Sequence, residues 1–314
     1  MSATDQDTDA EDDATLLLQA DELRSVARYF AAAKLLRTVS DTSLLTDQHR
    51  RILALADKAT LNCQLLIDSP TDSWMIQNSK STPRQRQGRR DTTVYYQVTP
   101  PHNIITTKIV MPMEQSLLLP LLSVWNESQL HATWMPRTTV PVRLGMSASH
   151  RIAEWEPGHQ VIQIQMDMPF PFSNRECLEH VTAVDAIDEM GKILVLVESV
   201  GAGFSLDDGN NANDTGQEEK VIGEPEKGYV RIDFDATISI EACPSDHPSL
   251  EHSTWDYQGE DRLLVSLAST INAHIAGVPM GLINFFTRTF YVSRHGQLCR
   301  SCERPRIFSM SLRS

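Results

Sequence analysis

Residues 160–177 read QVIQIQMDMPFPFSNREC, and the two halves of this stretch follow different patterns. In the first half apolar and polar residues alternate, and the apolar set is Ile162, Ile164, Met166 and Met168. Alternation of this kind predicts a strand that buries one face and exposes the other. The second half places two Pro-Phe pairs after the strand and then Arg175 and Glu176. The stretch therefore predicts a strand, a turn stiffened by proline and a second strand.

Segment 230–240, VRIDFDATISI, repeats this alternation. Its apolar face consists of Val230, Ile232, Phe234, Ala236, Ile238 and Ile240. Other runs rich in β-branched and aromatic residues predict strands at 92–98, 104–111, 177–187, 191–200 and 262–275. Strands with one apolar and one polar face are typical of an antiparallel sheet that covers a core on one side.

Two segments before the strands show helical spacing of apolar residues, at 15–38 and at 46–67. Thr46 is the expected N-cap of the second helix. Together the two segments predict a helical hairpin. The sequence leaves two interpretations of this hairpin open: a buttress packed on the main domain, or a separate module that binds a protein partner.

Two more helices are predicted further along the chain. A short one spans 113–125, with a break expected near Pro120. Another begins near Pro279, and residues 278–294 are apolar on nearly all sides, so most of this helix must be covered. Helices, then about seven strands, then one apolar helix indicate an α+β fold in which an antiparallel sheet curls around the last helix.

The formal net charge of −13 argues against a nucleic-acid binder, because such proteins meet phosphates with clustered Lys and Arg. Six acids fall within residues 5–13, so residues 1–14 are expected to form a disordered acidic N-terminus. The chain shows neither a signal-peptide pattern nor a run of about 18 apolar residues. Its five cysteines are scattered, which suggests reduced thiols and a cytoplasmic protein.

Motifs for catalysis or metal binding are weak. The chain has no G-x-S-x-G elbow and no Walker loop, and GAGFSL at 201–206 lacks the third glycine of a dinucleotide fingerprint. Cys299 and Cys302 lack a second pair of ligands for a tetrahedral zinc site. His180 shares a strand face with Leu178, which favours a hydrogen-bonded core or cavity histidine over a general base. We therefore expect no enzyme, no catalytic residue, no metal and no cofactor.

The succession of MPMEQSLLLPLLSVWNESQLHATWMP, VIQIQMDMPFPFSNRE, GYVRIDFDATISI and GVPMGLINFFTRTF resembles the START family, the StAR-related lipid-transfer domains. The resemblance spans residues 91–294. Its most specific pieces are 169–176, similar to the family's proline-rich loop ending in Ser-x-Arg-Asp, and 228–231, similar to its Gly-Tyr-Val-Arg. Trp134 resembles the family's tryptophan after the short helix, and 277–279 resembles its Gly-x-Pro entry into the last helix.

The resemblance implies a helix-grip fold, in which a curved antiparallel sheet grips a long C-terminal helix around a tunnel that holds one lipid. Members carry sterols, phospholipids or ceramide and are not usually enzymes. For this chain the resemblance implies intracellular lipid binding, which could extend to lipid transfer. The alternative is a START-like adaptor or ligand-sensing module that acts through protein partners without transfer activity.

The resemblance also implies where a lipid would lie. Phe170 and Phe172 would cover the tunnel mouth, or else simply seal the core. Arg175 and Glu176 would anchor the return into the next strand. The full expected lipid-binding set is Trp134, Ile164, Met166, Phe170, Phe172, Arg175, His180, Ile232, Phe234, Leu267, Met280, Ile283 and Phe286.

The expected organisation has four parts: the acidic N-terminus 1–14, the helical hairpin 15–70, a START-like lipid-binding domain 71–296 and a basic tail 297–314. Arginines outnumber acids from Met280 to the end of the sequence. Because basic residues are attracted to anionic headgroups, we expect this end to favour peripheral contact with anionic membranes.

Overall fold

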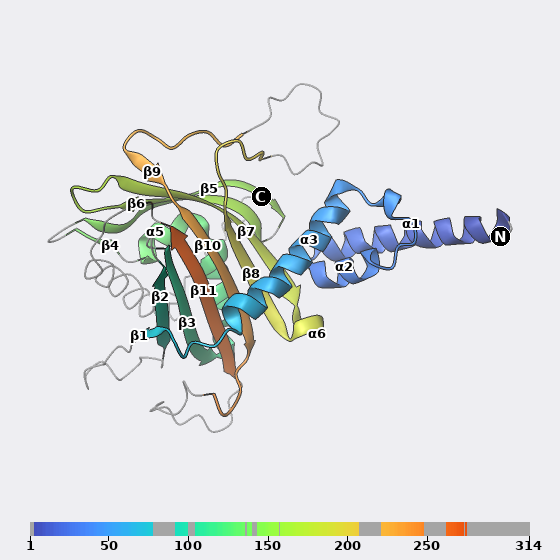
Figure 1. Cartoon of the computed structure of the whole chain (residues 1–314), viewed down its shortest axis with the longest axis horizontal. Helices are drawn as coiled ribbons and strands as arrows, with labels where there is room; N and C mark the ends of the chain where they lie inside the picture. The colour runs from blue at the N-terminus through green and yellow to red at the C-terminus, as the bar shows by residue number, and fades with distance from the viewer. Residues whose placement is uncertain are drawn as a thin grey trace, which may run out of the picture.

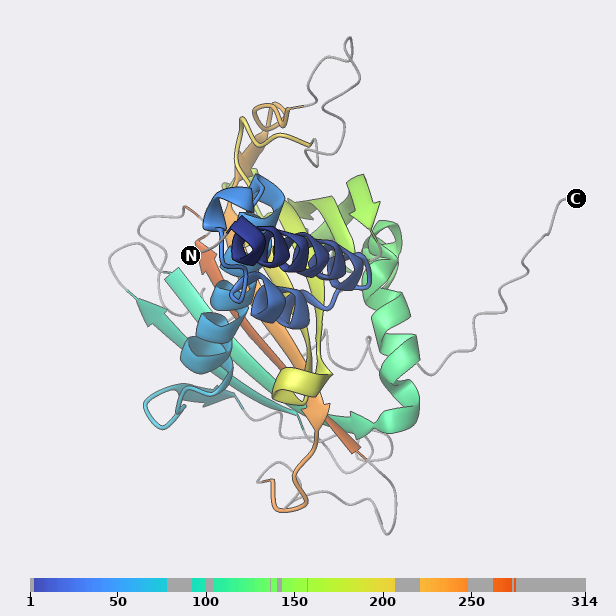
Figure 2. The ribbon, with the colours of Figure 1, turned by 90° about the vertical axis from the view of Figure 1, so that its right-hand side faces the viewer.

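The computed structural model describes residues 3–77, 92–99, 104–135, 137–139, 143–156, 158–206, 221–247, 262–272 and 274. Within these residues, three helices at the N-terminal end lead into an 11-stranded sheet, and short helices follow its third strand (Figures 1 and 2). The predicted α+β class with an antiparallel sheet is therefore confirmed. The helix expected from Pro279 lies outside the described residues, so its position against the sheet stays a prediction.

The N-terminal part consists of α1 (Ala3–Ser25), α2 (Tyr29–Leu36), the 3-10 turn η1 (Thr42–Leu44) and α3 (Asp47–Asn62), which continues as the π-helical turn η2 (Cys63–Ile67). Thr46 is the N-cap of α3, as predicted. The Thr46 hydroxyl accepts a hydrogen bond from the His49 amide, and the His49 ring accepts one from the Thr46 amide. This reciprocal pair satisfies backbone donors that the first turn of a helix leaves without partners.

Two predictions for this part are wrong. The start expected to be disordered, 1–14, is helical from Ala3 onward. Acids are favourable in the first turns of a helix because they meet the positive end of its dipole, and the buried Asp13 accepts from two backbone amides of the loop before α3. The single helix expected over 15–38 divides at Ala27, whose φ is 61° and whose carbonyl accepts from the Asp185 amide of the sheet.

The strands are β1 (Met75–Gln77), β2 (Thr93–Thr99), β3 (Ile104–Glu114), β4 (Arg137–Thr138), β5 (Leu144–Glu156), β6 (His159–Asp167), β7 (Asn174–Ala186), β8 (Lys192–Ser199), β9 (Tyr229–Arg231), β10 (Asp233–Ala242) and β11 (Arg262–Asn272). Their order in the sheet is β1-β2-β3-β11-β10-β8-β7-β6-β5-β4, with β9 beside β7. Neighbouring strands run antiparallel, except that β9 runs parallel to β7.

The strands predicted from alternation are present, with two differences. The continuous strand expected over 230–240 divides at Ile232 into β9 and β10, because the Ile232 amide donates to the Glu176 carbonyl of β7. The long strand β5 was not predicted, nor were the short strands β1 and β4. β5 lies beside β6, on the side away from β7, and so adds a further strand to the sheet.

Helical segments connect several of the strands: η4 (Gln115–Leu117), α4 (Leu118–Asn126), η5 (Ser128–Leu130) and α5 (His131–Trp134) after β3, and α6 (Ile187–Met190) between β7 and β8. Pro120 lies in the first turn of α4 and does not break the helix. A proline is tolerated there because the first-turn amides have no intrahelical partner to lose.

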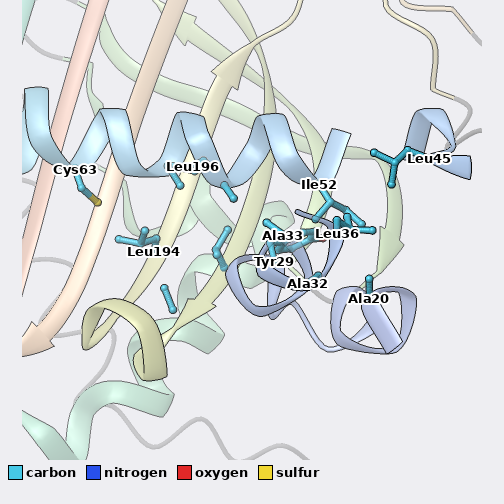
Figure 3. Close-up of a cluster of buried hydrophobic side chains, with 14 of the residues drawn as sticks. Ala20, Tyr29, Ala32, Ala33, Leu36, Leu45, Ile52, Cys63, Leu194 and Leu196 are labelled. Atoms are coloured by element: carbon cyan, nitrogen blue, oxygen red, sulfur yellow. The ribbon is translucent and has the colours of Figure 1, made fainter. Parts of the chain in front are cut away.

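The N-terminal helices cover the outer face of the sheet (Figure 2). This face bears Leu194 and Leu196 of β8 (Figure 3), together with Val184 and Ala186 of β7. These side chains share one buried cluster with residues of the helical part: Ala20, Tyr29, Ala32, Ala33, Leu36, Val39, Leu45, Ile52, Ala56, Ala59 and Cys63. Because the helices and the sheet bury the same core, the structure favours the buttress interpretation of the N-terminal helices.

Candidate functional site

The inner face of the sheet is the one opposite to the N-terminal helices. Paired residues of neighbouring strands point to the same side of a sheet, so the register traces this face from strand to strand. Ile164 of β6 pairs with Cys177 of β7. Ala236 of β10 pairs with Val197 of β8 and with Ser269 of β11, continuing the face across the sheet.

Two buried clusters make most of the inner face apolar. The first contains Met146, Ile162, Ile164, Cys177 and Ile232, with Met166, Val181, Phe234 and Ile271 among the side chains packed against it. The second contains Met111, Met113, Leu117, Leu121, Val124, Val195, Val197, Ala236, Ile238, Ile240 and Val265, with Leu267 and Phe234 packed against it. Since Phe234 contacts both clusters, they form one apolar surface, and α4 lies against it through Leu121 and Val124.

Five of the predicted lipid-binding residues meet on this surface: Ile164, Met166, Ile232, Phe234 and Leu267. Trp134 is the last residue of α5, and its side chain lies outside the described part of the structure. Met280, Ile283 and Phe286 also lie outside the described residues. The structure therefore brings together these five strand residues and leaves those predicted on the last helix as predictions.

Three polar side chains interrupt the apolar surface beside Ile164. Ser149 of β5 pairs with Ile164, and Ile164 pairs with Cys177, so the three lie in one row across β5, β6 and β7. Glu179 is the next residue of β7 on the same face. The Cys177 thiol donates to Glu179 Oε1 at 3.2 Å, and both side chains are buried.

Sequence reasoning missed Ser149, Cys177 and Glu179. Because β5 was not predicted, Ser149 could not be assigned to a strand or to a face of the sheet. Cys177 and Glu179 could have been placed, because they follow Arg175 by two and four positions, which puts all three on one face of a strand.

Arg175 belongs to the inner face at the start of β7, where it pairs with Met166. Its Nη1 atom donates to the Ser173 carbonyl at 2.5 Å, so the guanidinium turns back toward the preceding turn. In that turn the Phe172 amide donates to the Pro169 carbonyl at 3.0 Å. The Phe172 side chain is half-buried, whereas that of Phe170 is 96% exposed and does not seal a core.

On the outer face of the sheet, Glu176 fixes the position of the first residues of β7. Its buried carboxylate accepts from Arg231 Nη2 at 2.7 Å and from Gln163 Nε2 at 2.6 Å. Through these contacts and the Ile232 amide, one residue ties β7 to β6, β9 and the start of β10. The expected anchoring role of Glu176 agrees with this geometry.

His180 lies on the outer face, where it pairs with Val161 of β6 and Glu198 of β8. Its Nε2 atom is 2.6 Å from the Nε2 of His159, and the rings of Trp155 and Phe204 pack around it. Burial, the adjacent His159 and the Lys58 ammonium lower the pKa of His180 to about 4. The expected lipid-binding set places His180 together with Ile164. Ile164 of β6 pairs with Cys177, however, and the alternation of β7 turns His180 to the face opposite to Cys177.

Within the described part of the chain, no group of three or more His, Cys, Asp or Glu residues is arranged to hold a metal ion. Among the helices of that part, none is both long enough and apolar enough to span a membrane.

No family model matches the chain, and no curated protein matches it in sequence. Solved structures do resemble it. Human StAR-related lipid transfer protein 5 is 13% identical, with 81% of this chain and 97% of that chain covered and a TM-score of 0.49. Human STARD10 is 12% identical, with 82% and 80% covered and a TM-score of 0.47. The STAR-related lipid transfer protein of Xanthomonas axonopodis is 17% identical, with 72% and 99% covered and a TM-score of 0.42.

Proposed function

We propose that this protein binds one lipid against the inner face of its sheet, and that this binding serves intracellular lipid carriage. The observation that supports the proposal is the continuous apolar surface formed by the two inner clusters. Its side chains come from β3, β5, β6, β7, β8, β10 and β11, so the surface is long enough to contact a whole acyl chain or sterol ring system.

The two faces of the sheet differ in a way that favours the inner one. The outer face packs against the N-terminal helices, and its apolar side chains are buried in the core that it shares with them. On the inner face, α4 and α5 contribute apolar residues along one side. An apolar ligand held there would remove its own surface from water, which is the main source of affinity for such molecules.

The adaptor or ligand-sensing alternative needs an N-terminal module that is available to a protein partner. The shared core of α2, α3, β7 and β8 gives those helices an internal role instead. We therefore rank lipid binding first. In this proposal the protein is a non-enzymatic cytoplasmic carrier that meets anionic membranes peripherally through the basic segment 297–314, which lies outside the described residues.

Native mass spectrometry of the full chain purified from cells tests the proposal, before and after incubation with mixed phospholipid and cholesterol vesicles. We expect one lipid per chain. Leu267→Trp, which adds bulk on the inner face, should lower the bound fraction, whereas Leu61→Trp on the exposed side of α3 should not. A wild-type chain that carries no lipid in either condition contradicts the proposal.

A further inference from the structure

The inner face carries one buried hydroxyl that the described part of the chain does not satisfy. Ser149 is 5% exposed, and its Oγ has no hydrogen-bond partner among the described residues. Other buried polar groups on this face are paired: the hydroxyls of Thr107 and Ser269 lie 2.7 Å apart, and Ser128 donates to Gln160 at 3.1 Å. Because a buried polar group without a partner is destabilising, the state of Ser149 calls for an explanation.

A second polar feature lies in the same region. Glu179 is 5% exposed, and its carboxyl group accepts from the Cys177 thiol on the apolar surface. Ser149 and Cys177 lie on either side of Ile164, two strands apart, which corresponds to about 10 Å between their backbones. The two side chains extend from the same face, so a small polar group placed over Ile164 would come within reach of both β5 and β7.

We infer that Ser149, Cys177 and Glu179 form the polar end of the lipid site, and that they select a neutral lipid whose head bears a hydroxyl. This inference rests on the proposed function. A hydroxyl can donate to the carboxyl group of Glu179 and accept from the hydroxyl of Ser149. A phosphate in the same place would meet a carboxyl group in a region of low dielectric, where repulsion between like charges is strong.

The arginines of β5 and β7 on this face, Arg151 and Arg175, are held by other groups. Arg151 pairs with Ile162, in the row of Glu179, and its guanidinium donates to the Glu154 carboxylate and to the Asn126 carbonyl. Arg175 is on β7 four residues before Glu179, and its Nη1 donates to the carbonyls of Ser173 and Asn174. Its guanidinium is directed toward the turn at the end of the sheet, away from Ile164. Sterols, diacylglycerols and ceramides match the polar end of this site, whereas phosphoglycerides do not.

A competition experiment on the full chain tests the inference. Delipidated protein is incubated with vesicles that contain equal moles of cholesterol, ceramide, dioleoylglycerol and dioleoylphosphatidylcholine, and the bound lipid is extracted and quantified. The ratio of hydroxyl lipids to phosphatidylcholine on the wild type should exceed that in the vesicles. Ser149→Ala should lower this ratio by about fivefold to tenfold, the effect of one lost hydrogen bond. Glu179→Gln should raise the bound phosphatidylcholine.

Ser239→Ala is the matched control. Ser239 is also a buried serine whose hydroxyl has no partner among the described residues, but it pairs with Leu194 on the outer face. Both alanine variants remove an unpaired hydroxyl, so both should melt at or above the wild-type temperature. Only Ser149→Ala should change lipid selection.

The outcomes separate this inference from the proposed function. If the wild type binds lipid but prefers phosphatidylcholine, or if Ser149→Ala selects lipid as Ser239→Ala does, the polar end is assigned wrongly and lipid carriage stands. If the wild type binds none of the four lipids, the proposed function fails and this inference fails with it.

Discussion

At the scale of single residues, Glu176 shows how one buried charge can organise the sheet. Its carboxylate lies between Arg231 of β9 and Gln163 of β6, at the point where β7 begins. Taking a carboxylate out of water is costly unless charged and polar partners surround it, and here both kinds are present. The parallel pairing of β9 with β7 depends on this contact, since Arg231 pairs with Glu176 in the register as well.

Arg231→Met should destabilise the fold by about 3 kcal/mol, because it leaves the buried Glu176 carboxylate without its cation. The matched control is Arg50→Met, which removes an exposed ion pair with Asp47 and should cost less than about 0.5 kcal/mol. Urea denaturation measures both values. Equal stability of the two variants would show that the Glu176 contact does not hold the strands together.

His180 predicts how stability depends on pH. The folded state lowers its pKa to about 4 from an ordinary value of 6.5, so the unfolded chain binds the proton more tightly. The stability that the neutral ring contributes is therefore complete above pH 6.5 and is lost as the pH falls toward 4. Between pH 7.5 and pH 5 the loss attributable to this ring is about 2 kcal/mol.

Urea denaturation of the wild type and of His180→Asn at both pH values checks this. Because asparagine does not titrate, the variant should lose less stability on acidification than the wild type. Identical losses in the two proteins would mean that groups other than His180 set the acid sensitivity of the fold.

At the scale of elements, regular periodicity was what made prediction succeed. β6 and β10 alternate cleanly, and Thr46 precedes a helical pattern, so the presence of these elements followed from the sequence, although the break at Ile232 before β10 did not. β5 escaped prediction because its register against β6 shifts three times, between Met146 and Ala148, between Arg151 and Ala153, and between Glu154 and Glu156. Each irregularity resets which side the next residue faces, so the alternation vanishes from the sequence.

The same irregular strand explains why the candidate site was only half predicted. Apolar members such as Ile164 and Phe234 lie on regular strands, whereas Ser149 lies on β5 between two of its register shifts. The face of His180 was predicted correctly, since His180 and Leu178 share the outer face of β7, but its inclusion in the lipid-binding set did not follow this alternation. The division of α1 from α2 depends on a tertiary contact, the Ala27 carbonyl with the Asp185 amide, which no local pattern encodes.

The cap of α3 offers a test at this scale. Thr46→Ala removes the hydroxyl that accepts from the His49 amide and should cost about 1 kcal/mol of stability. Thr46→Ser keeps an accepting hydroxyl and should restore most of that loss. Thermal melting of the two variants compares them, and a serine variant as unstable as the alanine variant would mean that the threonine methyl group, and not the cap, is what matters.

At the scale of the whole molecule, the sheet separates two environments. Helices from the N-terminal part lie against the outer face and complete a core there (Figure 1). The inner face presents a second apolar surface interrupted by Ser149, Cys177 and Glu179. The first environment accounts for stability. The second is the one to which we assign the lipid, because its apolar extent and its few polar groups suit a molecule with a long apolar body and a small head.

Photo-labelling tests this assignment most directly. The full chain is loaded with a diazirine-bearing sterol or a diazirine-bearing ceramide, irradiated and digested, and the labelled residues are mapped by mass spectrometry. We expect labels on inner-face positions of β6, β10 and β11, such as Met166, Phe234 and Leu267, and fewer labels when unlabelled lipid competes. Labels confined to the outer face or to the N-terminal helices, or unchanged by competition, would contradict the assignment of the lipid to the inner face.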